Sequence, residues 1–142
     1  MAQLIDARTS QNASYANSIS IPVSTTPQLF AQLTLNTTGA GQNMRTQISG
    51  TAAVQLPLVP VATTITITIV RGNSPSDLII YSAREVLDTS VIGPQLISFT
   101  ASDFNVPITA NNRVVYTAYI SASVLGTTRV GPESFNATIY SD

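Results

Sequence analysis

Apolar and polar residues alternate along most of the chain with a period of two, which is the pattern of β-strands with one buried face. The clearest case is the segment 64–69, which reads Thr-Ile-Thr-Ile-Thr-Ile. We expect Ile65, Ile67 and Ile69 to face the core there. Similar patterns predict strands at residues 18–23, 29–35, 114–124 and 135–139, and weaker ones at 44–56, 77–87 and 95–101.

Glycine and proline separate these segments and predict turns or loops between them. The breakers stand at residues 39–41, 72–75, 93–94, 126 and 131–132. No segment shows the period of an amphipathic helix of ordinary length, and no repeat of 20–50 residues is present. About eight short strands at this spacing predict an all-β fold, a single antiparallel β-sandwich of jelly-roll type. Spacing alone leaves an immunoglobulin-like strand order open.

The first 17 residues are polar and show little alternation. We expect residues 1–17 to form an extended N-terminal arm or connector, and residues 18–142 to form the sandwich domain. An arm of this kind docks on a neighbouring subunit, with Leu4 and Ile5 as its anchors and with Ile19 and Ile21 beyond them. They would insert into the neighbour or extend its open sheet edge. A frayed tail is the alternative.

The composition excludes several classes of protein. The chain has 142 residues, which suits one domain, and it contains no Lys, His, Cys or Trp. Without His and Cys there is no Ser-His-Asp triad, no Cys nucleophile and no ordinary zinc site, and without Lys there is no Schiff-base chemistry. A net charge of −1 gives no electrostatic footprint for nucleic acid. We therefore expect no enzyme, no metal and no cofactor.

The N-terminus does not have a basic region followed by an apolar run, so we expect a chain that is made without a Sec signal peptide. The longest apolar runs, such as 54–62, are short and interrupted by Gln or Pro. No stretch of about 18 apolar residues is present, and we therefore expect no membrane insertion.

Two sets of carboxylates are candidate sites. A glycosidase needs two carboxylates that face each other across a cleft. Glu85 and Asp88 are close in sequence, but Arg84 beside them can neutralise either, and the chain has no Trp to line a sugar cleft. A second set lies at the predicted loop edges and offers oxygen ligands for Ca²⁺: Asp77, Asp103 and Glu133. Solvated turn residues are the simpler interpretation of this set.

Three aromatic residues fall on the polar side of their predicted strands. Tyr119 and Tyr140 lie beside Thr117 and Thr138, where they predict surface contacts with a sugar or with a neighbouring subunit. Phe30 falls opposite the apolar face of its strand, which indicates a covered surface and a subunit contact.

The outward strand positions carry Ser, Thr, Gln and Asn, and only 9% of all residues are charged, against about 25% in an average domain. Soluble β-proteins usually protect their sheet edges with charge, especially Lys. A neutral surface costs little to desolvate, so this composition favours a subunit whose flanks are buried against copies of itself. A carbohydrate- or surface-binding module and a virion shell or decoration protein fit the same composition.

The order of segments resembles that of small spore-surface proteins of the Bacillus group, of the exosporium-protein-C-like and endospore-appendage kind. The resemblance covers residues 28–142 and is strongest in VGPESFNATIY, where Val130-Gly131-Pro132 precedes the last strand. The segments that carry it are, in order, AQLTLNTTGAGQNMRTQISGTAAVQL, ATTITITIVRG, SFTASDFNVP, VVYTAYISAS and RVGPESFNATIYSD.

This resemblance implies a compact jelly roll, distantly similar to C1q/TNF-type domains. It also implies a structural role at the spore surface, as a subunit of a fibre or of the exosporium layer. The implied partners are copies of the chain itself, in a filament or a trimer, and an anchoring protein of the spore surface. Some fibres of this kind are cross-linked through cysteines in their arms. This chain has no cysteine, so its contacts must be non-covalent.

Overall fold

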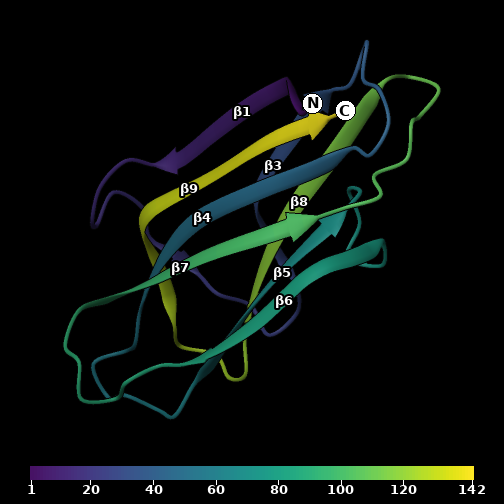
Figure 1. Ribbon diagram of the computed structural model, residues 1–142. Helices are drawn as coiled ribbons and strands as arrows, with labels where there is room; N and C mark the ends of the chain where they lie inside the picture. The colour runs from purple at the N-terminus through teal and green to yellow at the C-terminus, as the bar shows by residue number, and fades with distance from the viewer.

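The computed structural model describes all 142 residues, and they form nine β-strands and no α-helix (Figure 1). No helix in the structure has the length and apolar character needed to cross a membrane. The strands are β1 (Gln3–Ala13), β2 (Ile21–Pro22), β3 (Gln28–Asn36), β4 (Arg45–Gln55), β5 (Thr64–Arg71), β6 (Leu78–Val86), β7 (Pro94–Asp103), β8 (Arg113–Ala122) and β9 (Thr128–Ser141).

The strands form two antiparallel sheets that pack face to face as a sandwich. One sheet has the order β1-β9-β4-β7, with the short β2 also paired to β9, and the other has the order β3-β8-β5-β6. The first and last strands of the chain, β1 and β9, are neighbours in the first sheet. When the short β2 is left out, every connection except the β5–β6 turn crosses from one sheet to the other. This is the strand order of a jelly roll, because an immunoglobulin sandwich pairs its first strand with its second. The predicted fold class is confirmed.

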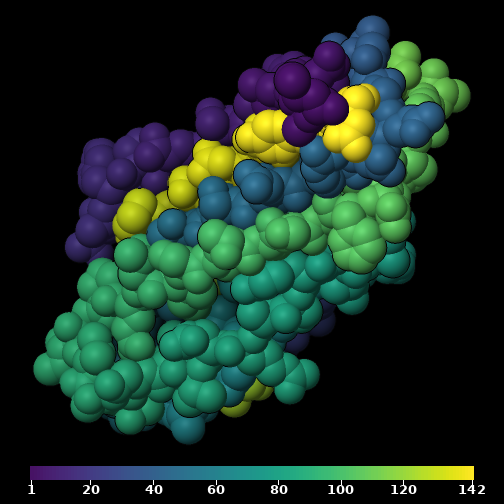
Figure 2. Space-filling view, in the orientation of Figure 1, coloured from purple at the N-terminus to yellow at the C-terminus, as the bar shows by residue number.

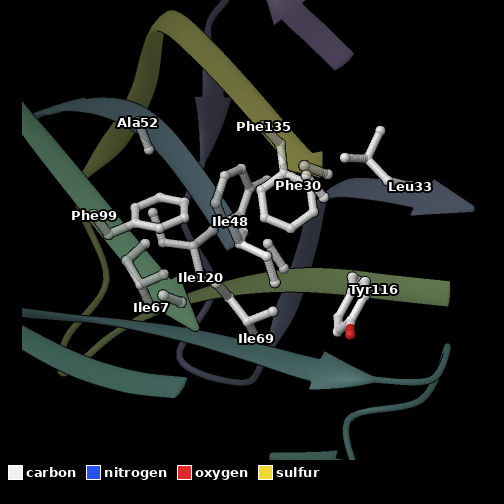
Figure 3. Close-up of a cluster of buried hydrophobic side chains, with 14 of the residues drawn as sticks. Phe30, Leu33, Ile48, Ala52, Ile67, Ile69, Phe99, Tyr116, Ile120 and Phe135 are labelled. Atoms are coloured by element: carbon white, nitrogen blue, oxygen red, sulfur yellow. The ribbon is translucent and has the colours of Figure 1, made fainter. Parts of the chain in front are cut away.

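The core lies between the sheets and contains a cluster of 25 buried hydrophobic residues (Figure 3). Ile65, Ile67 and Ile69 are all buried, as their alternation with threonine predicts. The rings of Phe30 and Phe99 meet edge to face at 6.3 Å between centroids, and the ring of Phe135 lies 6.4 Å from that of Phe99. Burial of these large side chains is the main source of stability in a chain without disulfides.

The sequence placed Phe30 on the outer side of its strand, and the structure shows this to be wrong. The pairing of β3 with β8 shifts register between Leu29 and Ala31. This bulge breaks the alternation, so Phe30 turns inward and is 3% exposed, whereas Leu29 stays exposed. Phe30 is therefore a core residue and not a surface for subunit contact.

The predicted boundary at residue 17 also differs from the structure. Residues 3–13 form β1, which pairs with β9 along nearly its whole length and closes one edge of the first sheet (Figure 1). Asp6 further ties β1 to the second sheet, because its Oδ2 accepts a hydrogen bond from the backbone N–H of Asn36 in β3 at 2.7 Å. The N-terminal segment is a strand of the sandwich and not a separate arm.

Candidate assembly surface

Each sheet ends in two edge strands, and these four edges lie on two flanks of the sandwich. β1 lies beside β3 on one flank, and β6 lies beside β7 on the other. An edge strand presents unpaired backbone N–H and C=O groups, so it is a template for pairing with another chain unless something prevents it.

Charge protects only one edge strand on each flank. β1 carries Asp6 and Arg8, and β6 carries Arg84 and Glu85. β3 has no charged residue, and the one charge in β7, Asp103, is 5% exposed and turned into the sandwich. The nine residues of β3 and the ten of β7 are therefore long edges without exposed charge of their own, one in each sheet and on opposite flanks. We call them the unprotected edges, although Asp6 of β1 binds the N–H of Asn36 at the end of β3.

The outer face of the first sheet is a regular array of uncharged polar side chains. Three positions on β4 point outward, and each has one neighbour on β9 and one on β7. A shallow groove of about 370 Å³ runs over this array, lined by hydroxyl and amide side chains. The three rows of the array are Thr138–Gln47–Ser102, Asn136–Ser49–Thr100 and Ser134–Thr51–Ser98.

Four of the thirteen charged side chains form two ion pairs within the sandwich. Arg71 on β5 holds Asp103 on β7 with two hydrogen bonds of 2.8 and 2.7 Å, so the pair bridges the two sheets. The hydroxyl of Tyr116 donates to Asp103 Oδ2 at 2.7 Å and lies 2.8 Å from Thr46 Oγ1. Burial raises the pKa of Tyr116 far above its usual range, and hydrogen bonding to Asp103 raises the pKa of Arg71. This network ties the sheets together, and the two charges neutralise each other within it.

A second buried ion pair joins Arg129 and Glu133, both on β9. The guanidinium donates two hydrogen bonds of 2.7 and 2.6 Å to the carboxylate, and Asn12 on β1 donates a third at 2.7 Å. The guanidinium carbon also lies 5.9 Å from the centre of the Phe30 ring. Because the carboxylate of Glu133 binds both Arg129 and Asn12, the pair helps to fasten β1 to β9 and is a structural feature.

The residues predicted as arm and edge contacts lie within the chain's own sandwich. Leu4 is 60% exposed and faces Tyr140 across the β1–β9 pair, so the structure brings these two together on the outer face. Ile5 packs against the core, Ile19 donates its N–H to the carbonyl of Val130, and Ile21 pairs with β9. The role of Leu4 and Tyr140 in subunit contact stays a prediction.

Tyr119 differs from its prediction as an exposed surface contact. It does point to the outer side of β8, opposite Thr68, but it is 5% exposed and its hydroxyl donates to the carbonyl of Asn73 at 3.1 Å. The β5–β6 turn therefore satisfies this side chain. Burial and the nearby Asp77 carboxylate raise the pKa of Tyr119.

The structure does not assemble the carboxylate pair considered for a glycosidase. Arg84 and Glu85 are neighbours on a strand, so their side chains point to opposite sides of the sheet. Asp88 lies in a turn, where its Oδ1 accepts hydrogen bonds from the N–H and hydroxyl of Ser90, and these lower its pKa. Nothing in this arrangement positions two carboxylates across a cleft.

The calcium set is also dispersed, and no group of three or more metal-ligating side chains exists in the structure. Asp103 is paired with the partly buried Arg71, and Glu133 is paired with the buried Arg129. Asp77 accepts the backbone N–H groups of Asn73 and Ser74 and shapes the β5–β6 turn. The interpretation of Asp77 as a turn residue is thus the one that the structure favours.

Sequence reasoning missed the two unprotected edges, although a signal was present. Residues 28–36 and 94–102 contain no charged side chain. The missing charge points to an assembly surface only once the strand order shows that these two segments are edge strands.

The comparisons with known proteins concern the fold. No protein-family model and no curated protein matches this sequence. Dimeric latent PorU from Porphyromonas gingivalis aligns with 98% of this chain at 10% identity and a TM-score of 0.53. An arabinose-bound α-L-arabinofuranosidase aligns with 96% at 8% identity and a TM-score of 0.49, and a chain of Broad Bean Stain Virus with 92% at 9% identity and a TM-score of 0.38.

This chain spans 13% of the PorU chain and 23% of the arabinofuranosidase chain, but the aligned segment covers 89% of the viral chain. At such low identity, the PorU match supports the sandwich fold and carries no information about activity, substrates or partners.

Proposed function

We propose that this protein is a non-enzymatic structural subunit that self-assembles, through its two uncharged edge strands, into a fibre or layer of the spore surface. The sequence resemblance supplies the spore surface as the location and a spore-surface protein as the anchor. Support for association between copies comes from the two edge strands without exposed charge, β3 and β7.

The observation that carries this proposal is the position of the unprotected edges. β3 and β7 belong to different sheets and lie on opposite flanks. If β3 of one copy pairs with β7 of the next, each junction uses two different surfaces and leaves one free edge at either end. Such a heterologous contact builds an open filament or, if the rotation closes, a ring such as a trimer.

The neutral outer faces support the same proposal. Backbone hydrogen bonds give edge pairing its affinity, and neighbouring side chains must be partly desolvated for it to form. Gln32 and Thr34 on β3, and Ser98 and Thr100 on β7, are exposed and uncharged, so their desolvation costs little. Since β1 is already paired with β9, docking of residues 1–17 as an arm is not part of this mechanism.

Lysine substitutions on the edges test the proposal. Gln32→Lys/Thr34→Lys and Ser98→Lys/Thr100→Lys each place two charges on one edge, and we expect each to abolish large assemblies in light scattering and electron micrographs. Gln47→Lys/Ser49→Lys is the matched control, because it adds the same charges to the same kind of exposed position on the central strand β4. Assembly that survives both edge variants would contradict edge pairing.

The groove over the polar array favours a second candidate, a module that binds neutral carbohydrate. Hydroxyl and amide side chains from three strands line it and can hydrogen-bond to sugar hydroxyls. Binding on a glycan array that Ser49→Lys removes would support this function. A virion shell or decoration protein would use the same self-assembly, and recovery of the assembly from spores or from virus particles distinguishes the two.

A further inference from the structure

Three loops meet at one end of the sandwich. They are the β4–β5 loop (56–63), the β6–β7 loop (87–93) and the β8–β9 loop (123–127), which lie together at the lower end in Figure 1. The first two line one groove, and a Cβ on Gly126 of the third would lie 3.4 Å from the ring of Pro57 in the first. We call this surface the apolar end.

The apolar end exposes several large hydrophobic side chains at the same place. Leu58 is 98% exposed, Ile92 99%, Val59 81% and Leu125 73%. Asp88 is the one charged residue in these three loops. In Figure 2 the teal and green segments of this end project at the lower left. Soluble monomers rarely expose a contiguous patch of this kind, so it indicates an interaction site.

The opposite end of the sandwich has a different character. It carries the Arg45–Asp142 ion pair and the exposed side chain of Arg113, together with polar turns and two exposed hydrophobic side chains, Phe104 and Ile108. Covering the apolar end with this charged end would desolvate charges without compensating them. The same end of a second copy is free of that cost, because it is equally apolar.

The apolar end also has projections and hollows side by side. The segment 55–58 forms a ridge that separates two grooves. One groove, of about 420 Å³, lies between this ridge and Ile19 with Val130, and the other, of about 350 Å³, lies between the ridge and the β6–β7 loop. A surface that carries both its own projection and its own hollow can pair with itself about a two-fold axis.

We propose that the apolar end is the interface of a two-fold symmetric dimer, in which Leu58 and Ile92 of each copy enter the grooves of the other. This surface is separate from the edges of β3 and β7, so dimer formation does not depend on edge pairing. If β3–β7 edge pairing and the apolar-end dimer both form, edge pairing builds rows of copies side by side, and the dimer joins two such rows through their apolar ends.

The test measures the mass of an edge-blocked variant, Gln32→Lys/Thr34→Lys, by light scattering. We expect a particle of twice 15.0 kDa. Addition of Leu58→Asp or Ile92→Asp should return it to 15.0 kDa. Ile108→Asp is the matched control, because Ile108 is 69% exposed and lies in the β7–β8 loop at the other end. This control should remain a dimer. All variants should keep the same β-sheet circular dichroism spectrum, since the substituted side chains are exposed, whereas the dissociated variants should unfold at a lower midpoint, because dimer formation stabilises the folded chain.

A disulfide test addresses the symmetry directly. The chain has no cysteine, so single variants report only on the positions chosen. A residue near a two-fold axis meets its own copy, and we expect mild oxidation to cross-link Leu58→Cys or Val91→Cys into dimers but not Ile108→Cys.

Three results would overturn the dimer. They are an edge-blocked variant of 15.0 kDa, a dimer that survives both Leu58→Asp and Ile92→Asp, and a monomer that binds neutral phosphatidylcholine vesicles through these residues. Edge pairing fails by a different result. If the wild-type chain forms only dimers that Ile92→Asp dissociates, the proposed filament is wrong and the apolar interface stands.

Discussion

The hydroxyl of Tyr116 donates a hydrogen bond to Oδ2 of Asp103 at 2.7 Å, across the interior of the sandwich. Tyr116 belongs to β8 and Asp103 to β7, so this bond joins one sheet to the other. Arg71 neutralises the same carboxylate, and Thr46 completes the contacts of the hydroxyl. The end of the sandwich near the chain's C-terminus is thus held by a satisfied polar network as well as by packing.

Replacement of Tyr116 by Phe should destabilise the protein by about 1.5–3 kcal/mol, the usual cost of losing a hydrogen bond to a charged group. The ring stays in place, so the loss isolates the hydroxyl. Urea unfolding measures it, with Tyr140→Phe as the control. Tyr140 is half-buried on the outer face of the first sheet, and we expect a change within about 0.5 kcal/mol. An unchanged Tyr116→Phe variant would show that the network contributes nothing to stability.

Stability should also fall at alkaline pH because of Tyr116. Burial raises the pKa of Tyr116 in the folded chain, whereas in the unfolded chain the phenol releases its proton near pH 10. Above that pH the unfolded state binds fewer protons than the folded state, so the free energy of unfolding decreases as pH rises, by at most about 1.4 kcal/mol per pH unit for this group. The Tyr116→Phe variant should show a shallower decline, and identical slopes would contradict the account.

Breaking the ion pair between Arg129 and Glu133 should be more costly. Glu133→Gln leaves a buried guanidinium without its counter-charge, and we expect a loss of about 3–5 kcal/mol in thermal or urea unfolding. The double variant Arg129→Met/Glu133→Leu removes both charges and should recover a large part of that loss. A double variant as unstable as the single one would mean that shape, and not charge, determines the effect.

Removal of residues 1–13 tests whether the N-terminal segment is a strand or an arm. The truncated chain loses β1, which is the partner of β9 on the side away from β4, and the hydrogen bond from Asn12 to Glu133. We expect amide hydrogen exchange in residues 135–141 to become at least about tenfold faster, which corresponds to about 1.4 kcal/mol of local stability. Unchanged exchange in β9 would indicate that the segment is a dispensable arm.

Periodicity predicted the strands whose faces differ most in polarity. The Thr-Ile repeat at 64–69 and the alternating segment 114–124 correspond to β5 and β8, because one face of each is buried and the other is polar. β1 escaped prediction because most of its side chains are exposed and its pairing with β9 rests on backbone hydrogen bonds, which leave no hydrophobic pattern. Phe30 was misplaced for a related reason, since a bulge reverses the alternation locally.

The candidate surfaces depend on topology and could be predicted only in part. The neutral composition of the strands was visible in the sequence, but the edge positions of β3 and β7 follow from the strand order. Likewise the apolar run 54–62 was visible, but its meeting with Ile92 and Leu125 needs three loops to come together. Residues distant in sequence become one surface only after the fold is known.

The most direct test of self-assembly is negative-stain electron microscopy of the purified wild-type chain, with its mass measured by light scattering in the same sample. We predict filaments or layers far heavier than the 15.0 kDa chain. A uniform monomer of 15.0 kDa at high protein concentration would contradict the proposal that this jelly roll is a self-assembling structural subunit.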